Sequence, residues 1–471
     1  MPSGIKDLGD SVFCNCIGLT SVDIPNGINS IGDYAFAGCT GLTSINIPDH
    51  VFIKKYAFKG CSNLEYIKIG NSGGDTESYT IFEDCPNIRE ILFDGNYVPS
   101  IFQKNSSIEK VTMSNNVTSI GDHAFLSCSN LVSVTIPSSV TSISRGAFEG
   151  CKSLVSIDMP NSVTSIENNA FSNCGLTSIK LPNSLTTIGE LAFYKCIGLT
   201  SLTLPNTVTK IGESAFGGNN LTSLTVYSET HPSIAFVDCK VDSLIFHCKE
   251  IRMKSVKGKI IIIGDEVTRI HDRAFCDNSV TTSVLIGSGL KNLGSEAFRN
   301  CREITSIILD NVTSVGSQAF EGCKKLTSVI LGNSLLYIGN RAFKGCRMTS
   351  ITIPATVKSI DYGAFENVPL DNVVLLIENP FPIEDELSSI FTYHSTLYVP
   401  IGTVEKYKTT KGWKDFFNIK ENPNETGIKS ALKESNNMII HSLRGEKLNN
   451  PSKGINIIKM KDGTAKKVFV K

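Results

Sequence analysis

Hydrophobic and polar residues alternate in short runs along most of the chain. In the run 131–137, "LVSVTIP", Val134 and Ile136 point to one side, and Ser133 and Thr135, which alternate with them, point to the other. Period-two alternation rich in β-branched residues predicts a half-buried strand. Pro137 ends the run, because proline donates no backbone hydrogen bond to a sheet.

The segment after each predicted strand turns back toward the interior. In 138–148, Val140 and Ile143 are offered to the core and "RGAF" makes a tight turn that inserts Phe148. One such unit has nothing to cover its own apolar row. Units that stack on one another cover each other, so the pattern predicts a solenoid stabilised by nearest-neighbour interfaces.

An Ala-Phe pair marks the repeat. Consecutive pairs are 22 or 23 residues apart, and about 17 units follow when degenerate copies are included. This period is typical of leucine-rich-repeat solenoids, here built mostly from short parallel strands and turns within the α/β repeat class. The expected column of stacked phenylalanines is Phe36, Phe58, Phe125, Phe148, Phe171, Phe193, Phe216, Phe275, Phe298, Phe320, Phe343 and Phe365.

The consensus "LTSIxIPxxVTSIGxxAFxGC", as at 42–61 or 176–196, resembles the BspA-like branch of leucine-rich repeats. That branch occurs in bacterial surface proteins, those of Bacteroidetes among them, and in some protozoan ones. The resemblance covers about 370 residues. It implies a repeat protein at the cell surface or secreted, with a role in adhesion or protein–protein interaction.

The repeat decays after Phe365, and we divide the chain accordingly. We expect a solenoid at 1–378, a capping unit at 379–420, a linker at 421–429 and a small β module at 430–471. A terminal solenoid unit must cover the last apolar rung. The pattern "YVPxGTxxxYxxxxGW", which ends at Trp413 and includes a helical stretch at 403–410, resembles the terminal unit of BspA-like proteins.

The last segment reads as strands, with an Asp462-Gly463 hairpin turn. From Pro423 onward there are ten Lys and Arg against four Asp and Glu. "SLRGEKL", "GINIIKM" and "KKVFVK" resemble the C-terminal sorting domains that Bacteroidetes use for type IX secretion. The alternative is a small terminal β module that packs on the acidic solenoid. Whether such a tail is cleaved is left open.

Composition narrows the function classes. The chain has 45 basic and 45 acidic residues, whereas nucleic-acid-binding domains are strongly basic. No apolar run approaches the roughly 18 residues of a transmembrane helix. The first residues lack the apolar core of a signal peptide and enter in mid-repeat. We therefore expect the natural N-terminus, with any targeting signal, to lie outside this sequence.

Most of the fifteen cysteines stand three residues after a repeat phenylalanine. Stacked rungs would align them in a column about 4.8 Å apart. Parallel side chains at that spacing hold their Cβ atoms farther apart than the usual ~3.8 Å of a disulfide. We predict buried thiols that pack as small apolar groups: Cys39, Cys61, Cys128, Cys151, Cys174, Cys196, Cys301, Cys323 and Cys346, with Cys16, Cys85 and Cys239 in equivalent positions.

No motif predicts catalysis, a cofactor or a metal site. The seven histidines are scattered, and the Gly-Xaa-Ser-Xaa-Gly around Ser72 lacks the helix that a nucleophile elbow requires. The repeat is irregular in the segment 217–274. A second interpretation is a zinc site there, since His231, Cys239, His247 and Cys248 have suitable side chains. We favour ordinary loop and core residues there, and a solvent-facing turn for His271.

The outward position of the predicted strands changes character along the chain. It is mostly polar up to Thr225 and then becomes apolar, at Ile245, Ile262, Leu285, Ile308 and Ile330. Five such residues make a stripe about 20 Å long. Contiguous exposed apolar surface usually marks an interaction site, so we expect the partner to bind there. Cover by the chain's own C-terminal segment, and no role beyond strand propensity, remain alternatives.

The sequence therefore favours a non-enzymatic protein that binds an extracellular protein or glycan of unknown identity. A structural alternative is self-association through the stripe into homodimers or arrays. The least favoured alternative is a hydrolase or metal site hidden in 217–274. No nucleic-acid partner and no transmembrane segment are expected.

Overall fold

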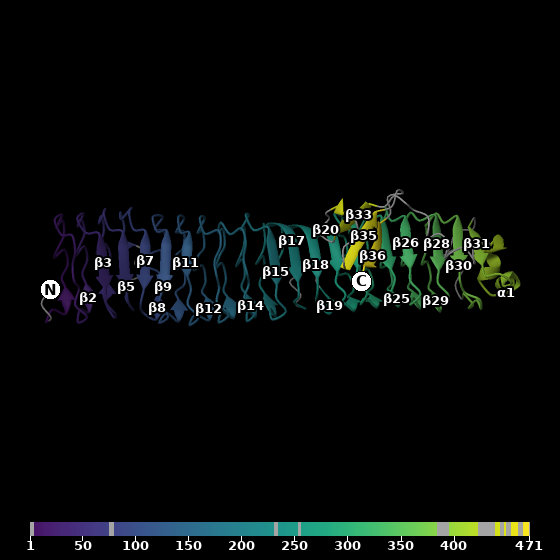
Figure 1. Cartoon of the computed structure of the whole chain (residues 1–471), viewed down its shortest axis with the longest axis horizontal. Helices are drawn as coiled ribbons and strands as arrows, with labels where there is room; N and C mark the ends of the chain where they lie inside the picture. The colour runs from purple at the N-terminus through teal and green to yellow at the C-terminus, as the bar shows by residue number, and fades with distance from the viewer. Residues whose placement is uncertain are drawn as a thin grey trace. The chain divides into compact units, whose positions relative to one another are not determined.

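The structure is a computed structural model that describes residues 4–74, 80–229, 234–252, 256–383 and 395–422, and four strands within 439–470. His231 and His394 therefore lie outside the described residues. The chain divides into two compact units, Met1–Val241 and Asp242–Lys471, which are described separately. Both are built from rungs that combine a longer strand, a turn, a two-residue strand and a second turn (Figure 1).

Unit 1 carries its longer strands on one face and its short strands on another. The longer strands are β3 (Ser44–Ile47), β5 (Tyr66–Ile69), β7 (Glu90–Phe93), β9 (Lys110–Met113), β11 (Ser133–Thr135), β15 (Ser201–Leu204) and β17 (Asn220–Val226). The short strands are β1 (Asp7–Leu8), β2 (Ser30–Ile31), β4 (Phe52–Ile53), β6 (Gly73–Gly74), β8 (Tyr97–Val98), β10 (Ser119–Ile120), β12 (Ser142–Ile143), β13 (Ser165–Ile166), β14 (Thr187–Ile188) and β16 (Lys210–Ile211).

Unit 2 repeats this plan, and β18 (Lys240–Phe246) begins in the last residues of unit 1. Its other longer strands are β20 (Gly258–Ile263), β22 (Ser283–Ile286), β24 (Ser306–Leu309), β26 (Ser328–Leu331), β28 (Ser350–Ile353), β30 (Asn372–Leu375), β31 (Thr396–Val399) and β32 (Asn418–Glu421). Its short strands are β19 (Glu250–Ile251), β21 (Arg269–Ile270), β23 (Asn292–Leu293), β25 (Ser314–Val315), β27 (Tyr337–Ile338) and β29 (Ser359–Ile360).

Parallel pairing in constant register holds the rungs together. In unit 1 five of the longer strands follow the order β11-β9-β7-β5-β3, in which Ile45 pairs with Ile67, and β15 pairs with β17 in another sheet. Along β3, Ile45 and Ile47 are buried while Ser44 and Asn46 are exposed. The parallel-strand solenoid predicted from the alternating pattern is therefore confirmed, with strands shorter than most because each rung soon turns.

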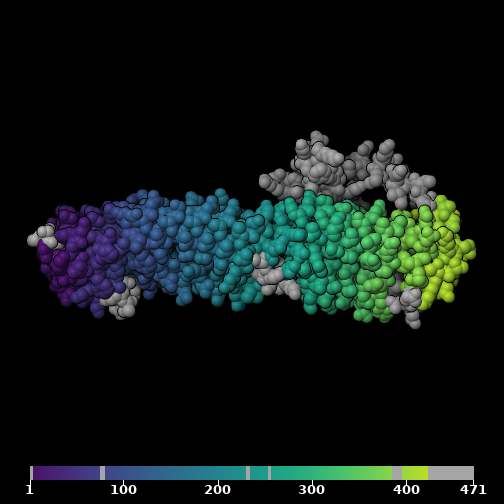
Figure 2. All heavy atoms as spheres, turned by 90° about the horizontal axis from the view of Figure 1, so that it is seen from below, coloured from purple at the N-terminus to yellow at the C-terminus, as the bar shows by residue number. Residues whose placement is uncertain are grey.

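The Ala-Phe pair joins each rung to the next through backbone and side chain alike. The Phe148 N–H donates to the Ala170 carbonyl at 2.9 Å, and the same bond recurs from Phe171 to Ala192 at 2.8 Å. Neighbouring rings in each column stack face to face, with centroids 5.0 to 5.5 Å apart. In unit 1 the residue colours change steadily along the surface, because each rung touches its sequence neighbours (Figure 2).

One place in the phenylalanine column of unit 1 departs from face-to-face stacking. Phe93, at the end of β7, lies edge-on to Phe102 and to Phe125, with centroid distances of 5.8 and 6.0 Å. An edge-to-face arrangement is also favourable for aromatic rings. The short rung around Phe102 is therefore accommodated by a ring from the sheet side of the core.

An atypical unit covers the last rungs of unit 2. Helix α1 (Val404–Thr409) lies within the predicted helical stretch and buries Tyr407, while a 3-10 turn (Trp413–Asp415) buries Trp413. The Trp413 indole N–H donates to the Phe381 carbonyl at 2.7 Å. The expected linker starts too early, since Glu421 still belongs to β32 and pairs with Val399.

The C-terminal tail forms one antiparallel sheet in the order β34-β33-β35-β36. Its strands are β33 (Ile439–Ser442), β34 (Lys447–Leu448), β35 (Gly454–Lys459) and β36 (Ala465–Val470). β35 and β36 pair from Gly454 with Val470 to Lys459 with Ala465, as a hairpin requires. The predicted Asp462-Gly463 turn and the linker beyond Asn422 lie outside the described residues.

Candidate functional site

The outward positions of the longer strands form a column in unit 1. Lys68 pairs with Leu92, Leu92 with Thr112, and Thr112 with Thr135. Farther along, Thr203 of β15 pairs with Thr225 of β17. Apart from Leu92 this column is polar, so strand pairing in this fold does not require apolar side chains at the outward position.

The equivalent positions in unit 2 carry the apolar stripe. Ile262 pairs with Leu285, and Ile308 pairs with Ile330. The Gly264 N–H donates to the Phe246 carbonyl at 2.8 Å, the bond that places Ile245 opposite Ile262. All five residues therefore occupy the outward position of β18, β20, β22, β24 and β26.

The stripe is not carried by one uninterrupted sheet, as a regular 4.8 Å spacing would require. β20 and β22 belong to one sheet, and β24 and β26 form another. The five side chains also differ in accessibility. Ile330 is 48% exposed, whereas the other four are half-buried. The stripe therefore consists of a patch of three residues on β18, β20 and β22 and a pair on β24 and β26, with Ile330 as its most accessible member.

Polar groups beside the stripe are satisfied within the protein. The Thr282 hydroxyl donates to the Lys259 carbonyl, and the Thr327 hydroxyl to the Thr305 carbonyl, each at 3.3 Å. Lys259 also pairs with Asp242 at 2.7 Å. The apolar side chains are thus the groups on this face that gain most from a partner, because water cannot satisfy them.

The cysteines occupy a column on the inner side of the phenylalanine turn. Ten of the thiols donate to the carbonyl of the phenylalanine in the preceding rung, for example Cys174 to Phe148 at 2.9 Å and Cys323 to Phe298 at 3.1 Å. All fifteen are free. The same bond is made by Cys39, Cys61, Cys85, Cys128, Cys151, Cys196, Cys301 and Cys346.

These thiols differ from the apolar packing groups that the sequence suggested. The structure makes them weak hydrogen-bond donors that satisfy a carbonyl inside the core. Burial raises the pKa of Cys128 and of Cys196 to about 12, because the thiolate would lose its hydration. Cys16 is exposed and Cys239 only half-buried, so these two are not part of the buried column.

Two asparagines that sequence reasoning missed occupy the cysteine position. The Asn219 amide N–H group donates to the Phe193 and Phe216 carbonyls, both at 3.0 Å. Asn278 stands three residues after Phe275 and is 1% exposed. Its side-chain amide has no hydrogen-bond partner among the described residues. The spacing from phenylalanine was the signal that could have found both.

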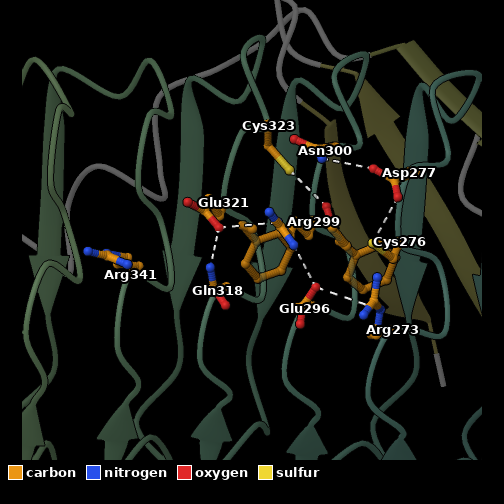
Figure 3. A network of polar contacts seen from close by, with 12 residues as sticks. Arg273, Cys276, Asp277, Glu296, Arg299, Asn300, Gln318, Glu321, Cys323 and Arg341 are labelled. Atoms are coloured by element: carbon orange, nitrogen blue, oxygen red, sulfur yellow. Dashed lines mark hydrogen bonds and ion pairs between the residues drawn. The ribbon is translucent and has the colours of Figure 1, made fainter.

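A charged network lies along the phenylalanine turns of unit 2 (Figure 3). Arg299 contacts Glu296 at 2.8 Å and Glu321 of the next rung at 3.2 Å. Arg273 approaches Glu296 at 3.7 Å. The hydrogen bond to Glu296 is the main reason that the pKa of Arg299 lies above its ordinary value. Opposite charges alternate from rung to rung, so the network neutralises itself and offers no strong field to a ligand.

Replacing Arg299 by glutamine is expected to lower the free energy of unfolding of unit 2 by about 1 kcal/mol, since two half-buried carboxylates lose their shared cation. Urea unfolding followed by circular dichroism measures the change. About half of it should vanish in 1 M salt. Lys325→Gln removes the more exposed Lys325–Glu303 pair and serves as the control, with a loss below about 0.5 kcal/mol. Equal losses in both variants would contradict the shared-cation account.

Within the described part of the chain, the candidate catalytic and metal residues do not come together into a reactive site. The Ser72 hydroxyl donates to the Pro48 carbonyl at 2.6 Å and is 5% exposed. His247 lies 3.2 Å from Glu266. Among the described residues, no group of three or more His, Cys, Asp or Glu is placed to hold a metal ion. His231, the fourth member of the zinc hypothesis, lies outside them.

His271 takes part in an ion-pair cluster. Its Nε2 lies 2.8 Å from Glu250, which also pairs with Arg252 at 2.5 Å. The hydrogen bond from His271, followed by that from Arg252, lowers the pKa of Glu250 to about 2. A carboxylate that accepts hydrogen bonds from His271 and from the Arg252 guanidinium is a weak base, so this cluster has a structural character.

The family model described as a BspA-type leucine-rich repeat region matches residues 1–98, 43–155, 96–175, 141–259 and 249–371. None of the curated proteins matches the chain.

Several solved structures are similar to the chain. A leucine-rich repeat protein from Bacteroides ovatus shares 23% identity over 84% of this chain and 87% of that one, with a TM-score of 0.40. A leucine-rich cell surface protein from Faecalibacterium prausnitzii shares 23% identity over 90% and 84%, with a TM-score of 0.24. A leucine-rich repeat protein of T. pallidum shares 28% over 37% and 74%, also at 0.24. Because the family model spans most of the sequence, the chain belongs to the BspA-type leucine-rich-repeat family.

Proposed function

We propose that the chain is a non-enzymatic binding protein, at the cell surface or secreted, that holds an extracellular protein or glycan against the longer-strand face of unit 2. The contact surface is the apolar stripe, Ile245, Ile262, Leu285, Ile308 and Ile330. The observation that carries the proposal is the contrast with unit 1. The same outward position is threonine in four of its strands, so the fold itself does not demand isoleucine there.

The energetics of the face support this choice. Burial of apolar surface contributes about 25 cal/mol per Å², and the neighbouring polar groups already have partners. A ligand that covers the stripe therefore gains hydrophobic free energy without having to replace many internal hydrogen bonds. Binding energy concentrated in a few central apolar residues is typical of protein interfaces.

A second candidate function is self-association through the same stripe. Ile308 and Ile330 lie side by side on paired strands. The same two residues of a second copy of the chain can pack against them across a twofold axis. A homodimer or surface array would then replace the external partner. Light scattering at micromolar concentration separates the two functions, because a monomer excludes self-association as the main role of the stripe.

Location at the cell surface is supported by the family and by the resemblance of the tail to type IX sorting domains. Sorting by that tail is part of the proposal. Within the described residues, no helix is long and apolar enough to cross a membrane.

The double change Ile308→Lys with Ile330→Lys tests the stripe. Two ammonium groups on opposed residues should abolish binding in a matrix-protein or glycan array, or convert a dimer to a monomer, because desolvating them is costly. Thr112→Lys with Thr135→Lys makes the same change on paired residues of unit 1 and should leave binding unchanged. Unaltered binding and oligomeric state in the stripe variant, with an unchanged melting curve, would refute the proposal.

A further inference from the structure

A hollow of about 480 Å³ lies in the longer-strand face of unit 1, beside β15 and β17. Three successive rungs line it. The residues that give it its chemistry are Lys180, Asn183, Thr203, Asn206 and Tyr227. Its volume is within the range of small-molecule sites, about 300 to 1,000 Å³. None of these residues belongs to the apolar stripe.

The hollow forms where the sheet of longer strands is interrupted. β15 pairs on one side with β17. On its other side the rung 176–181 carries the usual "LTSIKL" sequence but forms no strand. Between the segments 176–181 and 199–204, a long bond of 3.4 Å joins the Thr200 N–H to the Thr177 carbonyl. Beyond Thr200 these two segments do not pair as strands, since β15 is the edge of its sheet, and space opens above Thr203.

Tyr227 supplies an aromatic wall. It occupies the position that Pro182 and Pro205 hold in the two preceding rungs, directly after the last buried residue of the strand. Its side chain is 44% exposed, and its backbone N–H donates to the Leu204 carbonyl at 2.9 Å. The ring is thus carried on a fixed strand end and offers an apolar face together with a polar tip.

Two amides and a cation complete the lining. Asn183 and Asn206 are equivalent residues of neighbouring rungs, both exposed, and neither makes a side-chain hydrogen bond within 80–229. Lys180 is exposed and has no ion-pair partner in the same range. Each amide can donate and accept at once, and so can each hydroxyl of a sugar, whereas an ammonium group only donates.

We propose that this hollow binds a sugar ring that carries a carboxylate, such as a uronic acid residue. The apolar face of the ring packs on Tyr227, its hydroxyls pair with Asn183 and Asn206, and its carboxylate pairs with Lys180. The site is independent of the stripe, so it provides a second contact in the other unit. A single sugar ring bound in a shallow site of this kind is expected to have a dissociation constant of about 1 mM.

The experiment is saturation-transfer NMR with the full chain, using methyl β-glucuronide as probe. Methyl β-glucoside has the same ring without the carboxylate, and tetraglutamate offers carboxylates without a sugar. We expect transfer to the glucuronide, weaker transfer to the glucoside, and none to the peptide. Tyr227→Ala should weaken both sugars about tenfold. Proline is not used at this position, because it would remove the backbone bond to Leu204.

Lys180→Thr installs the residue of the equivalent position, Thr203, and should reduce glucuronide affinity to that for the glucoside, whose own affinity stays the same. Tyr337→Ala removes an exposed tyrosine of unit 2 and should change nothing. The proposal is overturned if 10 mM glucuronide shows no transfer, if neither Tyr227→Ala nor Lys180→Thr changes its binding, or if tetraglutamate competes with it. The stripe variant of unit 2 keeps this binding even if its own partner is lost, so the two proposals fail separately.

Discussion

Replacing Phe171 by alanine is expected to lower the free energy of unfolding of unit 1 by about 4 kcal/mol. The ring is fully buried and stacks on Phe148 and Phe193, with centroid distances of 5.4 and 5.3 Å. Its removal leaves a cavity between two rungs that cannot close, because the backbone bonds on either side fix the rung spacing. Both aromatic contacts are lost together with the buried apolar area.

Urea unfolding measures the loss, and hydrogen exchange locates it. Protection should fall most in the rungs next to Phe171, since stability in a solenoid is a sum of local interfaces. Phe52→Ala is the matched control, because Phe52 lies in the same unit and is 46% exposed. It should cost less than about 1 kcal/mol. A loss below about 1 kcal/mol for Phe171→Ala would show that the column is not a main source of stability.

Alkaline pH is expected to destabilise unit 1 steeply through its buried thiols. Burial raises the pKa of Cys128, Cys151, Cys174 and Cys196 above the ordinary value of 9.0. Above pH 9 the unfolded chain therefore loses thiol protons that the folded chain keeps. The thiols leave the free energy of unfolding of unit 1 unchanged below pH 9. As the pH rises from 9 toward 12, each thiol lowers that free energy by about 1.4 kcal/mol per pH unit.

A comparison with Cys151→Ala isolates this effect from other groups that titrate at high pH. Under reducing conditions the variant should be less stable than the parent at pH 8, because it loses a buried sulfur. At pH 10.5 the difference should shrink by about 2 kcal/mol, since the alanine has no proton to lose. Urea unfolding at the two pH values gives both differences. A difference that does not depend on pH would mean that the folded column ionises as readily as the unfolded chain.

Much of the fold follows from the repeated pattern, for reasons visible in single rungs. The alternation in 131–137 places Ile136 in the core, and the period of the Ala-Phe pair sets the distance between stacked rings. The cap around Trp413 could be anticipated, because the last rung of a solenoid needs a cover. In each case a local rule and the stacking requirement point to the same structure.

The interruptions of the sheet could not be predicted in the same way. The rung 176–181 has nearly the same letters as 199–204, yet only the second forms a strand. Pairing depends on how neighbouring rungs are spaced, which no single rung encodes. For the same reason the outward residues Leu285 and Ile308 gave no sign that β22 and β24 belong to different sheets.

Other features were within reach of the sequence and were missed. Arg299 and Glu321 are 22 residues apart, which is one rung, so their ion pair could be found by comparing equivalent positions. The thiol bond was missed because cysteine was treated as a small apolar residue. Asn219, an obligate hydrogen-bonding side chain in the same position, indicated that this position faces a carbonyl group.

The constant offset of the bonds between rungs has a consequence for how such a chain changes in length. The Phe148–Ala170 and Phe171–Ala192 bonds have nearly the same length, 2.9 and 2.8 Å, so loss of one whole rung would join two surfaces that already match. A deletion of one full period is then far less harmful than a deletion of a few residues within it. Related chains should therefore differ in length by whole repeats, because a repeat can be gained or lost without breaking the contacts between the remaining rungs.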